Sequence, residues 1–364
     1  MKLSSRLPVW SILCPVAAWV PLVLILAGHG VGLGNLFEVF LVIALIAGIL
    51  AAVFHAEVVA HRVGEPYGTL VLALAVTGIE VALIVSLMIA GGEAARGLAR
   101  DTVFASVMII LNGMVGLCLL SGGRRHGEQS FGLFGVSAAL VTLAAISVLT
   151  LVLPNYTTTT PGPVYSRSQL SFIAVVSLML YGTFVLVQTV RHRDYFLPTT
   201  AEADEAVHAP PPSNQMTLLS ATLLLVCLGA VVLLAKALSP SLERIVGSIG
   251  APKTLVGIII AVVVLLPESI AAYQAARANR LQTSLNLALG SALASIGLTI
   301  PAVSIVSLMT GWTLSLGIDA KSTVLLVLSL FVASLSLGTG RTTVMQGTVH
   351  LVIFAVYLFT AIIP

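Results

Sequence analysis

The chain has 364 residues, and only 9% of them are Asp, Glu, Lys or Arg, whereas about 25% is usual in soluble proteins. Its apolar content of 58% and mean hydropathy of +1.09 indicate that most segments prefer hydrocarbon to water, which excludes an ordinary water-soluble enzyme. The net charge of +3 comes without a basic tract that could neutralise phosphates, which argues against nucleic acid as a partner.

Eleven apolar segments are long enough to cross a bilayer, whose hydrocarbon core of about 30 Å needs roughly 20 helical residues. Their limits are 11–29, 35–57, 68–92, 101–121, 131–153, 169–190, 216–238, 253–277, 283–310, 320–338 and 344–363. The first segment is longer than the apolar part of a signal peptide and no small-residue cleavage site follows it, so we expect a retained helix.

These segments predict an all-α polytopic membrane protein built from two inverted repeats. We assign residues 1–32 to an extra N-terminal transmembrane helix, 33–190 and 216–364 to two repeats of five helices each, and 191–215 to a linker. More basic residues fall on the N-terminal side of the membrane than on the other, which predicts a cytoplasmic N-terminus and an external C-terminus.

The linker is the longest polar interruption of the chain. It contains Glu202, Asp204, Glu205 and three consecutive prolines from Pro210. Three carboxylates without the spacing of a calcium-binding loop bind Ca²⁺ poorly, so we interpret the linker as a solvated cytoplasmic tether and not as a cation sensor.

Two acidic residues lie deep inside predicted spans. Glu80 is near the centre of the third, in TLVLALAVTGIEVALIVSLM, and Glu268 is well inside the eighth, in TLVGIIIAVVVLLPESIAAYQAA. One carboxylate at the membrane centre costs about 2.5–3.5 kcal/mol on insertion scales. A single buried glutamate is often a protonated, structural hydrogen-bond donor, but two in matching positions favour a functional site.

The two glutamates occupy corresponding places in the two halves. Thr69-Leu70-Val71 opens the span of Glu80 and Thr254-Leu255-Val256 opens that of Glu268, and the next spans align Gly116 with Gly297. The spans of the two glutamates are the third and the eighth, an odd number of places apart, so the matching segments cross the membrane in opposite directions. This arrangement is typical of inverted repeats with a binding site near the midplane.

Oxygen donors accompany both carboxylates. Thr77 precedes Glu80 by three residues and lies on the same helical face, and Ser269 adjoins Glu268. Further candidate cation ligands on the following spans are Asn112, Ser291 and Ser295. Carboxylate, hydroxyl and amide oxygens without sulfur or imidazole favour Ca²⁺, Na⁺ or H⁺ over zinc or copper.

Helix-breaking residues stand next to both glutamates. Gly78 precedes Glu80, and Pro267 lacks the amide hydrogen that would bond the carbonyl of Val263, so we expect broken helices with free carbonyl oxygens. For most of the glycines on the following spans we expect close helix packing. These are Gly113, Gly116, Gly290 and Gly297.

Histidines give weaker signals. His55, Glu57 and His61 form a run at the end of the second span, but their spacing is not that of HExxH. We expect interfacial side chains or a proton-access vestibule there, and not a zinc site. His350, in the last span, is interpreted as a packing residue.

Three stretches carry a resemblance to a known family. They are HAEVVAHRVGEPYGTLVLALAVTGIEVALI (55–84), RDTVFASVMIILNGMVGL (100–117) and LLPESIAAYQAARANRLQTSLNLALGSALASIGLTIP (265–301). They resemble the cation/Ca²⁺ exchanger superfamily, its Ca²⁺/H⁺ antiporter branch, and within it the proteobacterial ChaA-type sodium-calcium/proton antiporters. The resemblance implies a bacterial inner-membrane protein in which Glu80 and Glu268 bind the transported cation. Family members commonly carry Gly-Asn three residues ahead of each glutamate, whereas this chain has Val76-Thr77 and Val264-Leu265, which leaves Na⁺ and K⁺ open as substrates.

The resulting hypothesis is secondary active exchange of Ca²⁺, or of Na⁺ or K⁺, for protons by alternating access, with the two glutamates titrating as a coupled pair. The predicted partners are transported cations, protons and the lipid bilayer, with no cofactor and with a homo-oligomer left open. The alternative is a cation channel that uses the same carboxylates. An intramembrane hydrolase with Ser291 as nucleophile is disfavoured because no histidine of suitable depth accompanies that serine.

Overall fold

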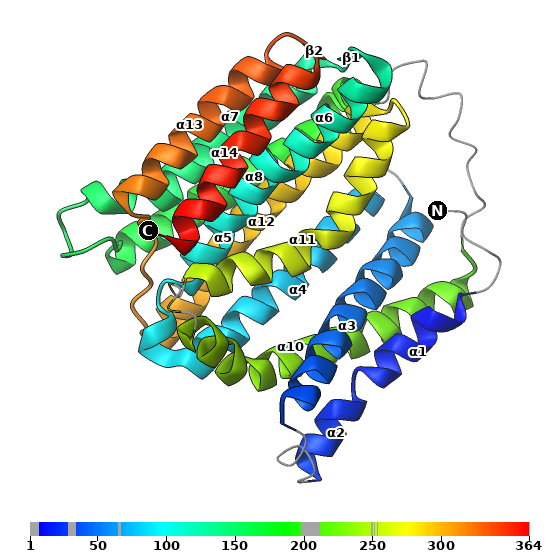
Figure 1. Ribbon diagram of the computed structural model, residues 1–364, viewed down its shortest axis with the longest axis vertical. Helices are drawn as coiled ribbons and strands as arrows, with labels where there is room; N and C mark the ends of the chain where they lie inside the picture. The colour runs from blue at the N-terminus through cyan, green and yellow to red at the C-terminus, as the bar shows by residue number, and fades with distance from the viewer. Residues whose placement is uncertain are drawn as a thin grey trace. The chain divides into compact units, whose positions relative to one another are not determined.

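The computed structural model describes residues 7–27, 34–64, 67–197, 212–248, 250, 252 and 254–363, and these residues are mostly helical (Figure 1). The helices are α1 (Val9–Ala17), α2 (Val20–Leu26), α3 (Gly34–Val63), α4 (Tyr67–Gly91), α5 (Leu98–Met108), α6 (Val115–His126), α7 (Leu133–Ser147), α8 (Arg167–Leu186), α10 (Asn214–Ser248), α11 (Thr254–Arg277), α12 (Leu281–Thr310), α13 (Ala320–Leu337) and α14 (Val344–Ile362). Three spans contain π-helical segments, at Ile109–Met114, Val148–Val152 and Val187–Arg191. Two short strands, β1 (Gln129–Ser130) and β2 (Arg341–Thr342), pair antiparallel.

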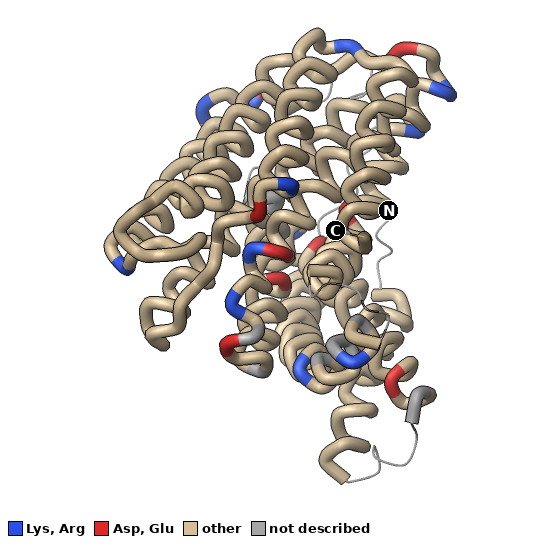
Figure 2. The backbone as a smooth tube through the Cα atoms, turned by 60° about the vertical axis from the view of Figure 1, so that its left-hand side comes forward, with Lys and Arg blue, Asp and Glu red and all other residues tan. Residues whose placement is uncertain are grey.

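The predicted membrane spans are confirmed. Within the described residues, ten helical segments are long and apolar enough to cross a membrane, and α4 adds an eleventh of 25 residues. At 1.5 Å per residue, α4 covers about 37 Å, which exceeds the hydrocarbon core. Charged residues are sparse along the helices, as Figure 2 shows. The chain is therefore a multi-pass, all-α membrane protein.

The first span differs from its prediction in one respect. It is divided into α1 and α2, with the break at Ala18 and Trp19, because Pro21 fits the first turn of a new helix but cannot continue the previous one. The acidic and proline-rich part of the predicted linker, from Glu202 to Pro211, lies outside the described residues, so the tether interpretation stays a prediction.

The chain forms two compact units, 1–95 with 207–250 and 96–206 with 251–364. Each unit contains helices from both predicted repeats, because the helices that pack together are not always neighbours along the chain. Grouping by packing does not test the limits of the repeats, 33–190 and 216–364, and these stay a prediction.

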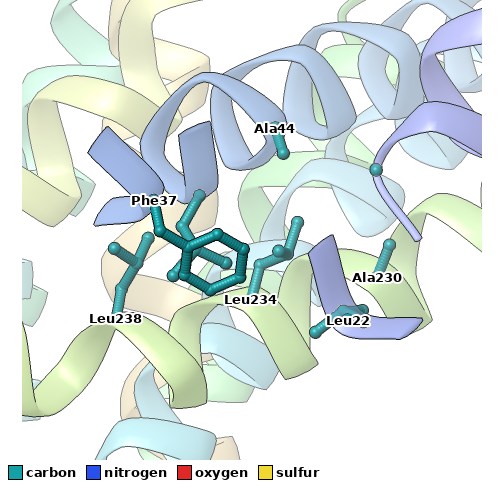
Figure 3. Close-up of a cluster of buried hydrophobic side chains, with 8 residues drawn as sticks. Leu22, Phe37, Ala44, Ala230, Leu234 and Leu238 are labelled. Atoms are coloured by element: carbon teal, nitrogen blue, oxygen red, sulfur yellow. The ribbon is translucent and has the colours of Figure 1, made fainter. Parts of the chain in front are cut away.

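In the first unit, α10 packs against α3 and α4, and α1 packs against α3. Leucine, alanine and phenylalanine side chains from α2, α3 and α10 make its buried core, in which Phe37 lies among Leu22, Leu234 and Leu238 (Figure 3). The two ends of α3 bind opposite ends of α10. The Glu38 carboxylate accepts from the Ser241 hydroxyl at 2.7 Å at one end. At the other end the Arg62 guanidinium donates to Asn214 at 2.5 Å, so α3 and α10 are antiparallel.

In the second unit, the span formed by α5, the π-helical segment and α6 is the most buried, and α11, α12, α13 and α14 surround it (Figure 1). Loops at one end of this unit bond to one another. β1 pairs with β2, Gln129 donates to the carbonyl of Ala276 at 3.0 Å, and Asn286 donates to the carbonyl of Phe196 at 2.6 Å. The ends of α6, α8, α11 and α13 are therefore gathered on one side.

The opposite end of the second unit is tied in the same way. The amide of Ser315 donates to the carbonyl of Arg96 at 3.2 Å, and the amide of Ile318 donates to that of Leu151 at 2.9 Å. The α5 span and α12, which the sequence aligns at Gly116 and Gly297, therefore run in opposite directions, as inverted repeats require.

Candidate functional site

Glu80 and Thr77 lie on α4, in the first unit. Both side chains are buried, with 3% and 4% of their surface exposed, and their spacing of three residues places them on one face. Burial at this depth, in a helix that packs against α3 and α10, agrees with the predicted setting of a functional carboxylate.

Glu268 and Ser269 lie on α11, in the second unit, and both are half-buried. The Ser269 hydroxyl donates to the carbonyl of Leu265 at 2.7 Å. Because its hydrogen is used in this bond, the oxygen has lone pairs left to face a cation.

The expectation of broken helices at the glutamates is wrong. α4 continues through Gly78 and α11 continues through Pro267. A proline removes one intrahelical bond, at the carbonyl of Val263, and in an apolar environment the remaining backbone groups keep their internal bonds. The irregular backbone lies one span further on, in the π-helical segment Ile109–Met114.

Asn112 lies in this π-helical segment and is fully buried. Its Nδ2 donates to the hydroxyl of Ser329 on α13 at 2.8 Å, and its Oδ1 accepts from Nδ1 of His350 on α14 at 3.2 Å. The sequence offers two weak signals for this site, an Asn-Gly pair of low helix propensity inside an apolar span and a histidine inside another.

Ser291 and Ser295 lie one turn apart on α12, the first half-buried and the second 2% exposed. α12 packs against α11 and against the π-helical segment, and α11 also packs against that segment. The structure therefore brings together the elements that carry Glu268, Asn112 and the two serines. Glu80 and Thr77 belong to the other unit, and their convergence with Glu268 stays a prediction.

The packing role of the glycines holds for three of the four. A Cβ atom at Gly113, Gly116 or Gly297 would lie 2.8–3.2 Å from atoms of Phe354, His350 and Tyr181, respectively. A Cβ at Gly290 would meet nothing within 4 Å.

His55 is fully buried within the first unit, on α3, which extends to Val63. The interfacial or proton-access setting expected for the run of His55, Glu57 and His61 stays a prediction. Its Nε2 donates to the carbonyl of Ser11 on α1 at 2.7 Å. Among the described residues, no group of three His, Cys, Asp or Glu side chains is arranged to hold a metal ion.

The second unit also has a cavity of about 90 Å³ where α5, α11 and α13 begin and α14 ends. It is lined by Asp101 and Asp319 and by Arg100 and Lys321, so its formal charges balance. Arg100 is paired with Asp101 at 2.7 Å and Lys321 donates to the carbonyl of Thr360 at 2.7 Å. A cavity of balanced charge does not favour a cation, and it contains none of the predicted ligands.

A family model described as sodium/calcium exchanger protein matches residues 35–190 and 219–363. The protein y4hA of Sinorhizobium fredii is 48% identical over 99% of this chain and 98% of its own length. The sodium-potassium/proton antiporter ChaA of Escherichia coli is 37% identical over 96% of this chain and 95% of its own length.

Among solved structures, that of the Ca²⁺/H⁺ antiporter YfkE superposes with a TM-score of 0.73 at 17% identity, covering 98% of this chain and 100% of YfkE. At this level of identity, the match concerns the fold. It agrees with the all-α architecture and with the order of spans along the whole chain.

Proposed function

The chain belongs to the sodium/calcium exchanger family and is a cation/proton antiporter, and from this premise we propose that Glu80 and Glu268 bind the transported cation and the protons in alternation. The observation that carries the proposal is the position of these carboxylates, each inside an apolar helix, one in each half of the chain. The presence of two such costly groups inside apolar helices is best explained by transport.

Charge balance explains the exchange. Two ionised carboxylates give a site of charge −2, which one Ca²⁺ or two protons neutralise, so occupancy by one excludes the other. If the protein changes its direction of opening only when the site is neutral, Ca²⁺ and protons must move in opposite directions. One Na⁺ or K⁺ leaves a charge and requires a second ion or one retained proton. We propose Ca²⁺ as substrate, with Na⁺ or K⁺ as alternatives, because ChaA is named for Na⁺ and K⁺ and YfkE for Ca²⁺.

Other oxygen ligands complete the proposed site. We assign this role to Thr77, Ser269, Asn112, Ser291 and Ser295. The cation is cargo and not a resident cofactor, which agrees with a site built from few charges and several neutral oxygens.

We further propose a location in a bacterial inner membrane, with the N-terminus cytoplasmic and the C-terminus external. The matched family consists of transporters, and we propose no catalytic residue. The channel hypothesis finds no support, since ChaA and YfkE are both named antiporters.

Exchange in inverted membrane vesicles with an acidic lumen tests the proposal. Adding Ca²⁺, Na⁺ or K⁺ in turn, with a fluorescent pH probe, identifies the cation that dissipates the proton gradient. We expect Glu80→Gln and Glu268→Gln to reduce this signal to that of vesicles without the protein, because the amide cannot titrate or carry charge.

Glu128→Gln is the matched control. Glu128 pairs with Arg341 at 3.2 Å on an exposed surface, with side-chain exposures of 54% and 73%, so its loss should leave exchange unchanged. Full exchange by either Glu80→Gln or Glu268→Gln would remove that residue from the site.

A further inference from the structure

His350 and Asn112 form a buried polar contact that the exchange mechanism above does not use. Both side chains are fully buried, on α14 and in the π-helical segment, respectively. Ser329 on α13 completes the cluster. All three residues belong to the second unit, so their contacts are internal to one compact body.

The hydrogen bonds fix the orientation of the Asn112 amide. The Ser329 hydroxyl donates its hydrogen to the carbonyl of Leu325 at 2.6 Å, so its oxygen accepts from Asn112. Nδ2 of Asn112 therefore faces Ser329, and Oδ1 faces His350. Since an amide oxygen only accepts hydrogen bonds, Nδ1 of His350 carries the hydrogen of the neutral imidazole and Nε2 is unprotonated.

The backbone at this point is arranged around the same imidazole. The amide of Val115 donates to the carbonyl of Ile110, five residues back, so it does not take the carbonyl of Leu111, which an α-helix would give it. His350 interacts with the carbonyl of Leu111 as well as with Asn112. The histidine thus contacts both the side chain and the backbone of the π-helical turn.

This cluster is not what packing alone would select. Among the described residues Nε2 of His350 has no hydrogen-bond partner, although it is buried, and an unsatisfied buried nitrogen destabilises a fold. An apolar residue at this position would avoid that penalty. The presence of a histidine here favours a role for the donated Nδ1 hydrogen.

We propose that His350 is a positioning residue for cation binding, which acts by orienting Asn112. The amide oxygen has two lone pairs. His350 takes one, and the other is held toward a cation bound beside α11 and α12, the helices of Glu268 and Ser295 that pack against the same π-helical segment. Ser329 fixes the other end of the amide, so that the oxygen cannot rotate away. This inference rests on the proposed function and names residues on α13 and α14 that support the site.

Cation dependence of transport tests the proposal. Purified variants in proteoliposomes are compared for apparent KM and maximal rate with Ca²⁺, Na⁺ and K⁺. We expect His350→Leu to raise the apparent KM about tenfold, the lower end for loss of a group that orients a ligand. His350→Asn keeps an N–H donor in place of Nδ1, and we expect its KM to return to within about threefold of the original protein. Ser329→Ala should also raise the apparent KM, as His350→Leu does.

Phe354→Leu is the control for packing. Phe354 lies one turn further along α14, against Gly113, and carries no polar group, so its truncation should leave KM unchanged. A wild-type KM in His350→Leu, or an equal rise in Phe354→Leu, overturns the role of His350. If His350→Leu does not fold, Ser329→Ala and His350→Asn are compared instead. A raised KM in Ser329→Ala with a KM near that of the original protein in His350→Asn supports the role of His350, and an unchanged KM in Ser329→Ala overturns it. Absence of exchange in the unmodified protein would instead count against the proposed function.

Discussion

At the scale of single residues, buried histidines in this protein bind groups that the helices themselves leave without partners. Pro15 lies inside α1 and has no amide hydrogen for the carbonyl of Ser11, four residues earlier. His55 of α3 donates to that same carbonyl at 2.7 Å. The contact attaches the extra N-terminal helix to the rest of the first unit, and it gives the buried His55 a hydrogen-bond partner.

A double-mutant cycle tests this pairing. We expect His55→Ala to lower the stability of the detergent-solubilised protein by about 1–3 kcal/mol, because it leaves a buried carbonyl unsatisfied. In a Pro15→Ala background the restored amide can bond Ser11, and the cost of His55→Ala should fall by about 1 kcal/mol. Unfolding followed by tryptophan fluorescence measures the stability of the single and double variants. If the stability costs of the two substitutions simply add, His55 and Pro15 are independent.

At the scale of elements, α14 and α6 are held together by glycines that allow their backbones to approach. A Cβ atom at Gly347 would lie 2.4 Å from the amide nitrogen of Leu120 and 2.9 Å from the carbonyl oxygen of Gly116. Side chains cannot relieve a clash with backbone atoms, so the two helices would have to separate. This close contact between α14 and α6 positions His350, which lies one turn beyond Gly347 on α14.

Matched glycine substitutions test the close contact between α14 and α6. We expect Gly347→Ala to destabilise the protein by about 1–3 kcal/mol, as overpacking does. Gly182→Ala on α8, where a new Cβ meets nothing within 4 Å, should be neutral or stabilise by up to about 1 kcal/mol through helix propensity. Thermal unfolding of the two variants in the same detergent gives the comparison. Equal stability of both would show that the α14–α6 contact is looser than described.

At the scale of the whole molecule, eleven spans place alternate loops on opposite sides of the membrane. The bonds between loops at each end of the second unit agree with this alternation. The distribution of basic residues predicts that the N-terminal side is cytoplasmic.

Cysteine labelling tests the orientation. In a cysteine-free background, which replaces Cys14, Cys118 and Cys227, we expect Thr158→Cys to react with a membrane-impermeant maleimide in intact cells. Thr339→Cys, which is also exposed but on the other side, should react only after permeabilisation. The reverse pattern would invert the proposed topology and place the N-terminus outside.

The sequence by itself determined the class of fold, the number of spans and the two intramembrane glutamates, because the bilayer imposes a fixed length, a fixed composition and a high cost for charge. These are properties of one segment at a time. The tertiary structure decided that α4 and α11 are continuous, that the π-helical turn lies at Asn112, and that His350, given only a packing role from the sequence, binds that amide. Such contacts join residues up to 238 positions apart, and the identity of a hydrogen-bond partner depends on how helices pack, which no local pattern encodes.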